Sequence, residues 1–257
     1  MNIYQVDAFT EKIFGGNPAA VCPLEAWLED SIMQQIAMEN NLSETAFFIK
    51  EDEFFRIRWF TPEMEIDLCG HATLASAHVI FNHLKYSGDT IKFLYRDGEL
   101  SVTKESDILS MNFPAIISKK AVVTELISRS LGKVPKEVYI ARDLMVVFES
   151  EKEVIDLSPD FNKMSEIEAL GVIATATGND VDFVSRFFAP SAGINEDPVT
   201  GSAHCMLIPF WAERLGKNKL NALQLSNRKG ELICEFKGDR VDIAGKAITY
   251  MIGEISI

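Results

Sequence analysis

One acidic side chain, Glu44, stands where the sequence changes from a helical pattern to an apolar run. It lies within residues 40–47, which read NNLSETAF. A carboxyl group beside an apolar strand is partly removed from water, which disfavours its charged form and suits it to taking up and releasing protons. The plainer interpretation is a loop glutamate in water, and the pattern alone leaves both open.

Further polar side chains gather at two glycine-led turns. They are few: Cys69, His71, Glu196, Asp197, Thr200 and Ser202. A small polar residue at a helix start is commonly only a cap, and an Asp before a Pro often only sets a turn. A single histidine in such a place is as readily a structural residue, so the turns alone do not decide between structure and chemistry.

A repeat across the midpoint of the chain links these turns. Residues 58–62 read RWFTP and residues 186–190 read RFFAP, and each segment is soon followed by a Gly that opens an uncharged stretch. The uncharged stretches, 71–84 and 202–212, contain no Asp, Glu, Lys or Arg. A helix without a polar face must be buried on all sides, so we expect each to be wrapped by sheet. Chance similarity, with two ordinary helices in one large core, is the alternative.

The repeat has a chemical consequence at the helix starts. A helix N-terminus offers unpaired N–H donors and partial positive charge, so it binds carboxylates without help from Lys or Arg. If two duplicated halves face each other, two such ends converge on one cleft. Aligning Gly70 with Gly201 places His71 opposite Ser202.

The same alignment makes the two halves chemically unequal. In an approximate register, the counterpart of Glu44 is Val172, so only one half carries a carboxylate at that position. Cys69 likewise faces Thr200 rather than a second cysteine.

The remaining pattern predicts a mixed α+β chain. Short β-rich runs outnumber helical ones, and helical periods recur at 24–39 and 121–131. Residues 14–20, FGGNPAA, predict a turn around Asn17 that either reaches the cleft or merely joins two strands.

Bulk composition excludes several classes of protein. The chain has 257 residues, 47% apolar and 25% charged, with a formal net charge of −13. Such an acidic protein is disfavoured as a partner of nucleic acid or of an anionic membrane. The four cysteines form no C-x-x-C pair, and neither a secretory leader nor a membrane-length apolar run is visible. We therefore expect free thiols and a cytoplasmic location.

Motifs for cofactor chemistry are missing from the sequence. There is no G-x-G-x-x-G, no G-x-x-x-x-G-K-[ST], no H-E-x-x-H and no G-x-S-x-G, and the four histidines show no ligand spacing. We predict no cofactor and no metal site, which leaves acid–base chemistry by side chains.

Taken together, five segments resemble the signature blocks of the PhzF-like (phenazine-biosynthesis-like) family. In order they are 7–10 (DAFT), 16–21 (GNPAAV), 41–47 (NLSETAF), 67–73 (DLCGHAT) and 195–203 (NEDPVTGSA). The resemblance implies a diaminopimelate-epimerase-like α+β fold with two similar domains, each a curved sheet or open barrel around a central buried helix. It assigns residues 1–115 to the first domain, with a strand at 249–257 returning to it, and 116–248 to the second. Homodimers are common in the family.

The family also implies roles for residues. In its phenazine-pathway members a Glu moves a proton during isomerisation of a cyclic dihydro-hydroxy amino acid, and Glu44 matches that Glu. His71, Asp197 and Ser202 match the supporting catalytic groups. The loop at Asn17 and the two turns would bind the substrate through Asn17, Cys69, Gly70, Thr200 and Gly201.

One departure concerns the cysteines. Related epimerases of this fold use two facing cysteines, whereas this chain has Cys69 and Thr200. Two-cysteine racemisation is therefore disfavoured. The sequence predicts a cofactor-independent isomerase that moves a proton on a small amino- or hydroxycarboxylate through Glu44. A non-catalytic metabolite-binding or scaffold protein and a Cys69-based epimerase or dehydratase are the alternatives.

Overall fold

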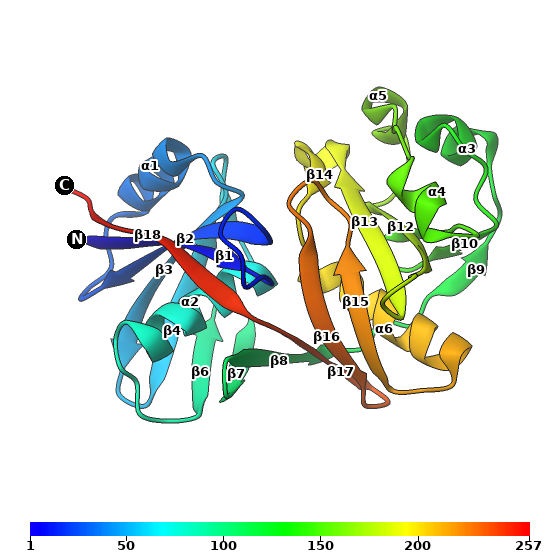
Figure 1. Cartoon of the computed structure of the whole chain (residues 1–257). Coiled ribbons are helices and arrows are strands. Elements are labelled where there is room, and N and C mark those ends of the chain that lie inside the picture. Colours follow the sequence, from blue (N-terminus) through cyan, green and yellow to red (C-terminus); the bar gives the residue numbers. More distant parts are fainter. The chain divides into compact units, whose positions relative to one another are not determined.

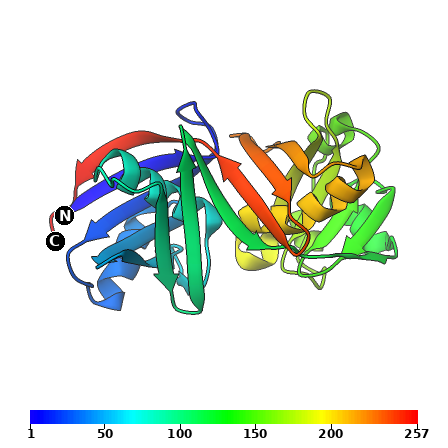
Figure 2. The ribbon, with the colours of Figure 1, turned by 90° about the horizontal axis from the view of Figure 1, so that it is seen from below.

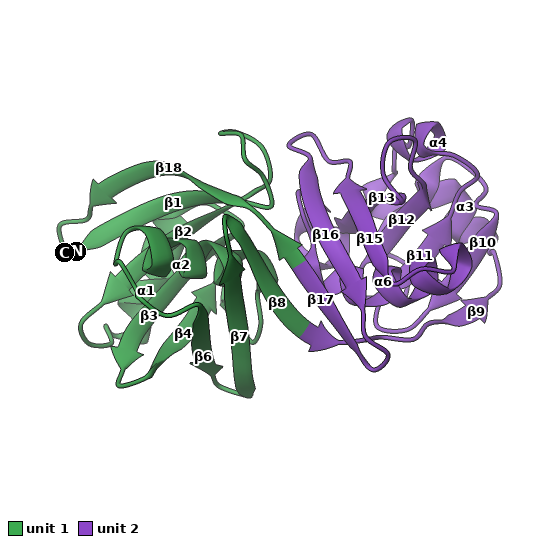
Figure 3. Cartoon of the chain, turned by 60° about the horizontal axis from the view of Figure 1, so that its bottom comes forward, with its two compact units in different colours: residues 1–112, 244–257 green, residues 113–243 purple.

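The computed structural model describes all 257 residues, which form two compact units (Figure 3). Unit 1 contains Met1–Asn112 and Ala244–Ile257, and unit 2 contains Phe113–Ile243. The chain passes between them in β8 (Ile108–Pro114) and returns in β17 (Arg240–Gly245). Each unit is described by itself.

Unit 1 is a mixed sheet with two helices. Its other elements are β1 (Asn2–Ala8), β2 (Asn17–Leu24), α1 (Asp30–Asn40), β3 (Glu44–Glu51), β4 (Phe54–Phe60), β5 (Glu65–Ile66), α2 (Gly70–Asn82), β6 (Thr90–Tyr95), β7 (Gly98–Glu105) and β18 (Ala247–Glu254). Strand β1 pairs antiparallel with both β2 and β18, and the β2–β3 and β4–β6 pairs are parallel. The last strand thus lies beside the first (Figure 2), and the Met1 amino group donates to the carbonyl oxygen of Ile255 at 2.7 Å.

Helix α2 lies at the centre of unit 1 because it has no polar face. It packs against β1, β2, β3 and β18 (Figure 1), and the side chains along nearly its whole length are buried. Helix α1 covers the other face, where Met33 and Ile36 meet Phe47 of β3. Successive strand residues point to opposite faces, so Glu44, Ala46 and Phe48 lie opposite Phe47 and toward α2.

Unit 2 repeats this arrangement. Its other elements are β9 (Lys119–Ala121), α3 (Glu125–Leu131), β10 (Glu137–Ile140), β11 (Leu144–Val147), α4 (Glu151–Ile155), α5 (Phe161–Met164), β12 (Val172–Thr177), β13 (Phe183–Ala189), the 3₁₀ turn η1 (Pro190–Ala192), β14 (Ile194–Asp197), α6 (Gly201–Leu215), β15 (Lys219–Gln224) and β16 (Gly230–Phe236). The β11–β12 and β13–β15 pairs are parallel, as β2–β3 and β4–β6 are in unit 1.

Helix α6 is the buried helix of unit 2. It contains Pro209, which cannot donate a hydrogen bond to the carbonyl of Cys205 one turn earlier. The backbone N–H of Ile116 donates to that carbonyl instead, at 2.9 Å. On the inner side of the sheet, Trp211 of α6 donates from Nε1 to Oγ1 of Thr175 at 3.0 Å. Helices α3, α4 and α5 close the opposite face around a separate apolar core.

The duplication predicted from the sequence is visible in matching contacts. Arg58 of β4 makes a bidentate pair with Glu65 of β5, and Arg186 of β13 makes the same pair with Glu196 of β14. The expected α+β class, with a curved sheet around a buried helix in each unit, is confirmed. Both helices begin at the predicted glycines.

Three sequence-based expectations for local structure need correction. Residues 14–20 are a loop only in part, because β2 already begins at Asn17. Helix α1 begins at Asp30, since the apolar residues Trp27 and Leu28 pack on the core from an irregular segment. Helix α3 begins only after Thr124, whose hydroxyl accepts the N–H of Ile127.

Two further observations bear on the whole chain. All four cysteines are free and buried. None of the helices combines the length and the apolar character that crossing a bilayer requires.

Candidate active site

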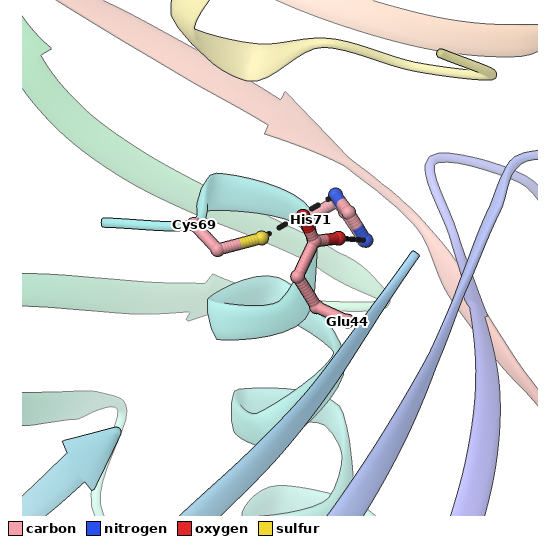
Figure 4. Close-up of side chains that lie close together, drawn as sticks. All are labelled: Glu44, Cys69 and His71. Carbon is pink, nitrogen blue, oxygen red and sulfur yellow. Dashed lines mark hydrogen bonds and ion pairs between the residues drawn. The ribbon is translucent and has the colours of Figure 1, made fainter. Parts of the chain in front are cut away.

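Three buried side chains of unit 1 meet at the start of α2. Nε2 of His71 lies 3.0 Å from Oε2 of Glu44, and Nδ1 of His71 lies 3.5 Å from Sγ of Cys69. Figure 4 shows Glu44 reaching from β3 toward the first turn of α2, where Cys69 and His71 point back at it. The side chains of His71 and Glu44 are only 6% and 11% exposed.

Local backbone structure fixes these positions. Asn41 ends α1 in the left-handed conformation, with φ +48°, and Glu44 then opens β3 beside Ala19 of β2. Cys69 is the extended residue just before α2, and its side chain makes no capping bond there. His71 therefore sits in the first helical turn, on the side that faces the sheet.

Asn17 completes the cluster. It is fully buried, and its Nδ2 lies 3.1 Å from Nδ1 of His71. Its place depends on Gly16, which has φ +58° and where a Cβ atom would lie 2.0 Å from the carbonyl oxygen of Ala8. Only glycine permits this turn, and the turn starts β2 with Asn17 opposite Ala8.

Charge and burial oppose each other in this cluster. Burial raises the pKa of the Cys69 thiol, and the nearby charge of Glu44 raises it further, so the thiol stays protonated at neutral pH. Burial alone would lower the pKa of His71, but its contacts with Cys69 and with the carboxylate of Glu44 raise it above its usual value. Because Cys69 is a neutral thiol, Glu44 is the charge that acts on His71.

The predicted residues of unit 2 form a second polar cluster at the start of α6. Thr200 donates from Oγ1 to Oδ2 of Asp197 at 2.5 Å, and its N–H donates to Oε1 of Gln224 at 2.9 Å. Gln224 also donates from Nε2 to the carbonyl oxygen of Asp197 at 2.8 Å. These bonds fix the turn that leads into Gly201, so Asp197 and Thr200 are held before any ligand binds.

Ser202 belongs to a neighbouring set of contacts. Nη2 of Arg142 donates to Oγ of Ser202 at 2.8 Å and to Oδ2 of Asp143 at 2.8 Å. Asp143 is fully buried, and burial raises its pKa against the opposing effect of Arg142. The result is a partly exposed guanidinium beside the first turn of α6.

Sequence reasoning found most of these residues and missed two. Glu44, Cys69, His71 and Asn17 come together in unit 1, whereas Asp197, Thr200 and Ser202 gather in unit 2. Gln224 and Arg142 were missed because each lies far along the chain from the glycine-led turns, with no motif around it. The other acidic candidate, Glu196, is paired with Arg186 on the sheet.

The unit 1 cluster also contains donors of a kind that bind metals. One ligand atom from each of Glu44, Cys69 and His71 lies within 4.8 Å of the others, and all three residues are buried. A carboxylate, a thiolate and an imidazole together suit a borderline ion such as Zn²⁺. Histidine spacing could not reveal this set, since Glu44 joins it from another element.

The fold belongs to the epimerase-like structural class. A hydroxyproline epimerase from Agrobacterium vitis shares the fold, with a TM-score of 0.60 at 10% identity over 98% of this chain and 91% of that one. A PhzF-family structure from Enterococcus faecalis has a TM-score of 0.98 at 48% identity, over 100% of this chain and 99% of that chain.

Sequence comparison gives the family. The profile of the phenazine biosynthesis-like proteins matches residues 6–253. A relative named as an uncharacterized isomerase from Pseudomonas aeruginosa is 49% identical over 257 residues, covering 100% of this chain and 99% of the relative. The chain belongs to the phenazine biosynthesis-like (PhzC–PhzF) family, and it is an isomerase.

Proposed function

We propose that this protein is a cofactor-independent isomerase that moves a proton on a small unsaturated amino- or hydroxycarboxylate. The carboxylate of Glu44 takes a proton from one carbon, the double bond shifts, and Glu44 returns a proton to another carbon. One C–H bond breaks and one forms, so the reaction needs no oxidant or reductant.

The observation that carries the proposal is the pair of Glu44 and His71. Oε2 of Glu44 and Nε2 of His71 are 3.0 Å apart and buried, yet neither atom has a well-aligned hydrogen-bond partner. Buried polar atoms without such a partner are costly in a folded protein. A site that gains its missing bonds from a bound substrate accounts for this cost.

A one-base reaction fits the other residues better than a two-base reaction. The strand register corrects the expected counterpart of Glu44 from Val172 to Gly171, because Val172 pairs with Phe188 as Thr45 pairs with Phe60. Gly171 has no side chain that ionises. Burial keeps the Cys69 thiol protonated, so this thiol is a poor base. These facts favour Glu44 over the Cys69-based alternative.

Within unit 2, the start of α6 carries groups that suit a carboxylate. Ser202 and the guanidinium of Arg142 supply a hydroxyl and a positive charge there, 2.8 Å apart. Hydrogen bonds from a guanidinium to a carboxylate are among the stronger ones in proteins. Asp197 would accept a bond from an amino or hydroxyl group. A homodimer is a prediction of the family resemblance, and a cytoplasmic location is a prediction of the sequence composition.

A metabolite panel in D₂O tests the proposal. Wild-type protein and Glu44→Gln are incubated with small amino- and hydroxycarboxylates, and mass spectrometry follows deuterium uptake and product formation. We expect conversion of at least one compound by the wild type and a loss of about 100-fold or more in Glu44→Gln. Equal rates for the two proteins would refute the role of Glu44. Ligand-induced thermal stabilisation without any conversion would favour the non-catalytic alternative.

A further inference from the structure

We infer that Asn17 is a positioning residue that decides which ring nitrogen of His71 carries the proton, so that Nε2–H faces Glu44. This inference rests on the proposed function for its effect on catalysis, but the tautomer itself can be measured without a substrate. The family resemblance suggested only that the loop at Asn17 contacts substrate. Its complete burial and its bond to His71 point to a different role.

The argument begins with what an amide nitrogen can do. The Nδ2 atom of Asn17 has two hydrogens and no acceptor capacity, so a hydrogen bond from it requires a lone pair on the ring nitrogen. When the His71 ring is neutral, Nδ1, at 3.1 Å from Nδ2, is therefore the acceptor and bears no hydrogen. The proton of the neutral ring is then on Nε2, which lies 3.0 Å from Oε2 of Glu44.

Cys69 acts in the same direction but more weakly. Its protonated thiol lies 3.5 Å from Nδ1 of His71 and is a weak donor. The start of α2 also places partial positive charge beside the ring, which disfavours a second proton there. Glu44 opposes these effects because its charge stabilises the imidazolium. A second proton would go to Nδ1, and the Asn17 amide would have to turn its oxygen toward the ring.

The backbone holds Asn17 where this bond requires it. Asn17 is the first residue of β2, paired with Ala8, and the residue before it is Gly16 in the left-handed conformation. Residues 17, 19 and 21 share one face of the strand, and that face is turned toward α2. The bond is thus a consequence of the sheet register and does not depend on a mobile loop.

The link to Glu44 follows from the tautomer. With hydrogen on Nε2, His71 offers a donor 3.0 Å from the carboxylate, and a small rotation of the Glu44 side chain would align a hydrogen bond that holds Glu44 while it gains and loses a proton. With hydrogen on Nδ1 instead, a lone pair of Nε2 would face the lone pairs of Oε2, and the two atoms would repel. Asn17 therefore acts on Glu44 through His71.

Nitrogen NMR of the histidine side chains tests the tautomer directly. Spectra of uniformly ¹⁵N-labelled protein are recorded over a range of pH, and the His71 signals are identified by their absence in His71→Gln. The ¹⁵N signals of Nδ1 and Nε2 are then compared at a pH where the ring is neutral, to show which nitrogen carries the hydrogen. We expect hydrogen on Nε2 in the wild type and in Cys69→Ala. In Asn17→Asp a carboxylate faces each ring nitrogen, so we expect hydrogen on Nδ1 as well as on Nε2.

The wild-type spectrum alone can overturn the inference, even if a variant fails to fold. Hydrogen on Nδ1 of the neutral wild-type ring would contradict it, as would an unchanged pattern in Asn17→Asp. A shift in Cys69→Ala without one in Asn17→Asp would transfer the role to Cys69.

An activity measurement connects the tautomer to catalysis. With a substrate found by the panel, Asn17→Asp should lower kcat at least tenfold and leave KM within about threefold, because Asn17 acts on Glu44 and not on the substrate. A rise in KM with unchanged kcat would show that Asn17 binds substrate instead. Should Glu44→Gln retain activity, the proposed function fails, whereas the spectrum still decides the tautomer.

Discussion

Glu44 and Gly171 occupy matching positions in the two copies of the repeat. Thr45 of β3 pairs with Phe60, and Val172 of β12 pairs with Phe188, the repeat partner of Phe60. The residue before each of them, Glu44 in one copy and Gly171 in the other, therefore holds the same place in the sheet. Only one of the two can carry a proton. The duplicated fold has thus kept its backbone while the chemistry at this position exists in one copy, which is the basis of the one-base account.

The start of α6 offers a prediction about substrate affinity. Arg142→Gln removes the guanidinium beside Ser202, and we expect KM to rise about 10- to 100-fold, the range for losing a hydrogen bond to a charged group, with a smaller change in kcat. Steady-state kinetics on a converted carboxylate measures this. The KM of Arg142→Lys should lie between those of the wild type and Arg142→Gln, because lysine keeps the positive charge but lacks the planar guanidinium that can make two parallel hydrogen bonds.

Two controls separate this effect from general damage. Arg214→Gln removes a positive charge from the other end of α6, where Arg214 is paired with Glu137, and should leave KM unchanged. Arg142→Gln also leaves buried Asp143 without its cation, so its thermal stability is compared with that of Arg142→Gln combined with Asp143→Asn. If KM stays at the wild-type value in Arg142→Gln, the carboxylate is bound elsewhere.

Because His204 is buried, we expect the free energy of unfolding to depend on pH. Burial lowers its pKa to about 4, although Nδ1 donates to the carbonyl oxygen of Thr200 at 2.8 Å. In the unfolded chain a histidine has a pKa near 6.5, so between pH 6.5 and pH 4 the unfolded state binds more protons at His204 than the folded state. The contribution of His204 to the free energy of unfolding therefore falls as the pH drops from about 6.5 to about 4, and it is constant below that. The loss is about 3 kcal/mol, at 1.36 kcal/mol per pKa unit.

The variant His204→Thr isolates this contribution. The choice follows the repeat, because Thr73 of α2 makes the matching bond from Oγ1 to the carbonyl of Cys69 at 2.6 Å. Urea unfolding at several pH values should show a shallower acid slope in His204→Thr, even if the smaller side chain lowers stability throughout. His78, whose pKa burial also lowers to about 4, contributes equally to both proteins. An unchanged slope would mean that His204 titrates normally in the folded state.

The Cys69 thiol should react slowly in the native protein. It is buried, and burial raises its pKa, so little thiolate is present near neutral pH. Mass spectrometry after iodoacetamide treatment should find Cys69 unmodified in the folded protein and modified after unfolding in urea. Rapid native labelling would indicate an exposed thiolate and would revive the Cys69-based reaction.

Metal addition and removal distinguish proton transfer from metal catalysis. If Glu44 works as a free carboxylate, dialysis against EDTA should leave turnover unchanged, and Zn²⁺ should inhibit by binding Glu44, Cys69 and His71. Loss of activity in EDTA with recovery on adding Zn²⁺ would contradict the account, because the cluster would then be a metal centre. Isothermal titration with Zn²⁺ gives the affinity.

Much of the fold could be predicted from local patterns. The absence of charges from 71–84 and 202–212 marked the buried helices, because a helix without a polar face has no place at a surface. Gly70 and Gly201 marked where they begin. The repeated Arg-aromatic-Phe segments marked β4 and β13. In the structure, the arginine of each segment pairs with a glutamate on the next strand.

The parts that could not be predicted depend on contacts distant in sequence. Asn17 looked like a turn residue because the glycines before it dominate the local pattern, whereas the sheet register makes it the start of β2. Gln224 fixes the turn at Thr200 from the end of β15, and Arg142 reaches Ser202 from the loop before β11. None of these pairings leaves a local signal in the chain.

The most direct test of the central claim follows one hydrogen through the reaction. A substrate deuterated at the carbon that loses its proton is converted in H₂O, and mass spectrometry locates the label in the first-turnover product. A single buried base that removes and returns the proton should deliver part of that deuterium to the new carbon. Glu44→Gln should give no transfer. Product with hydrogen taken entirely from water from the first turnover, or unaltered transfer by Glu44→Gln, would contradict the account.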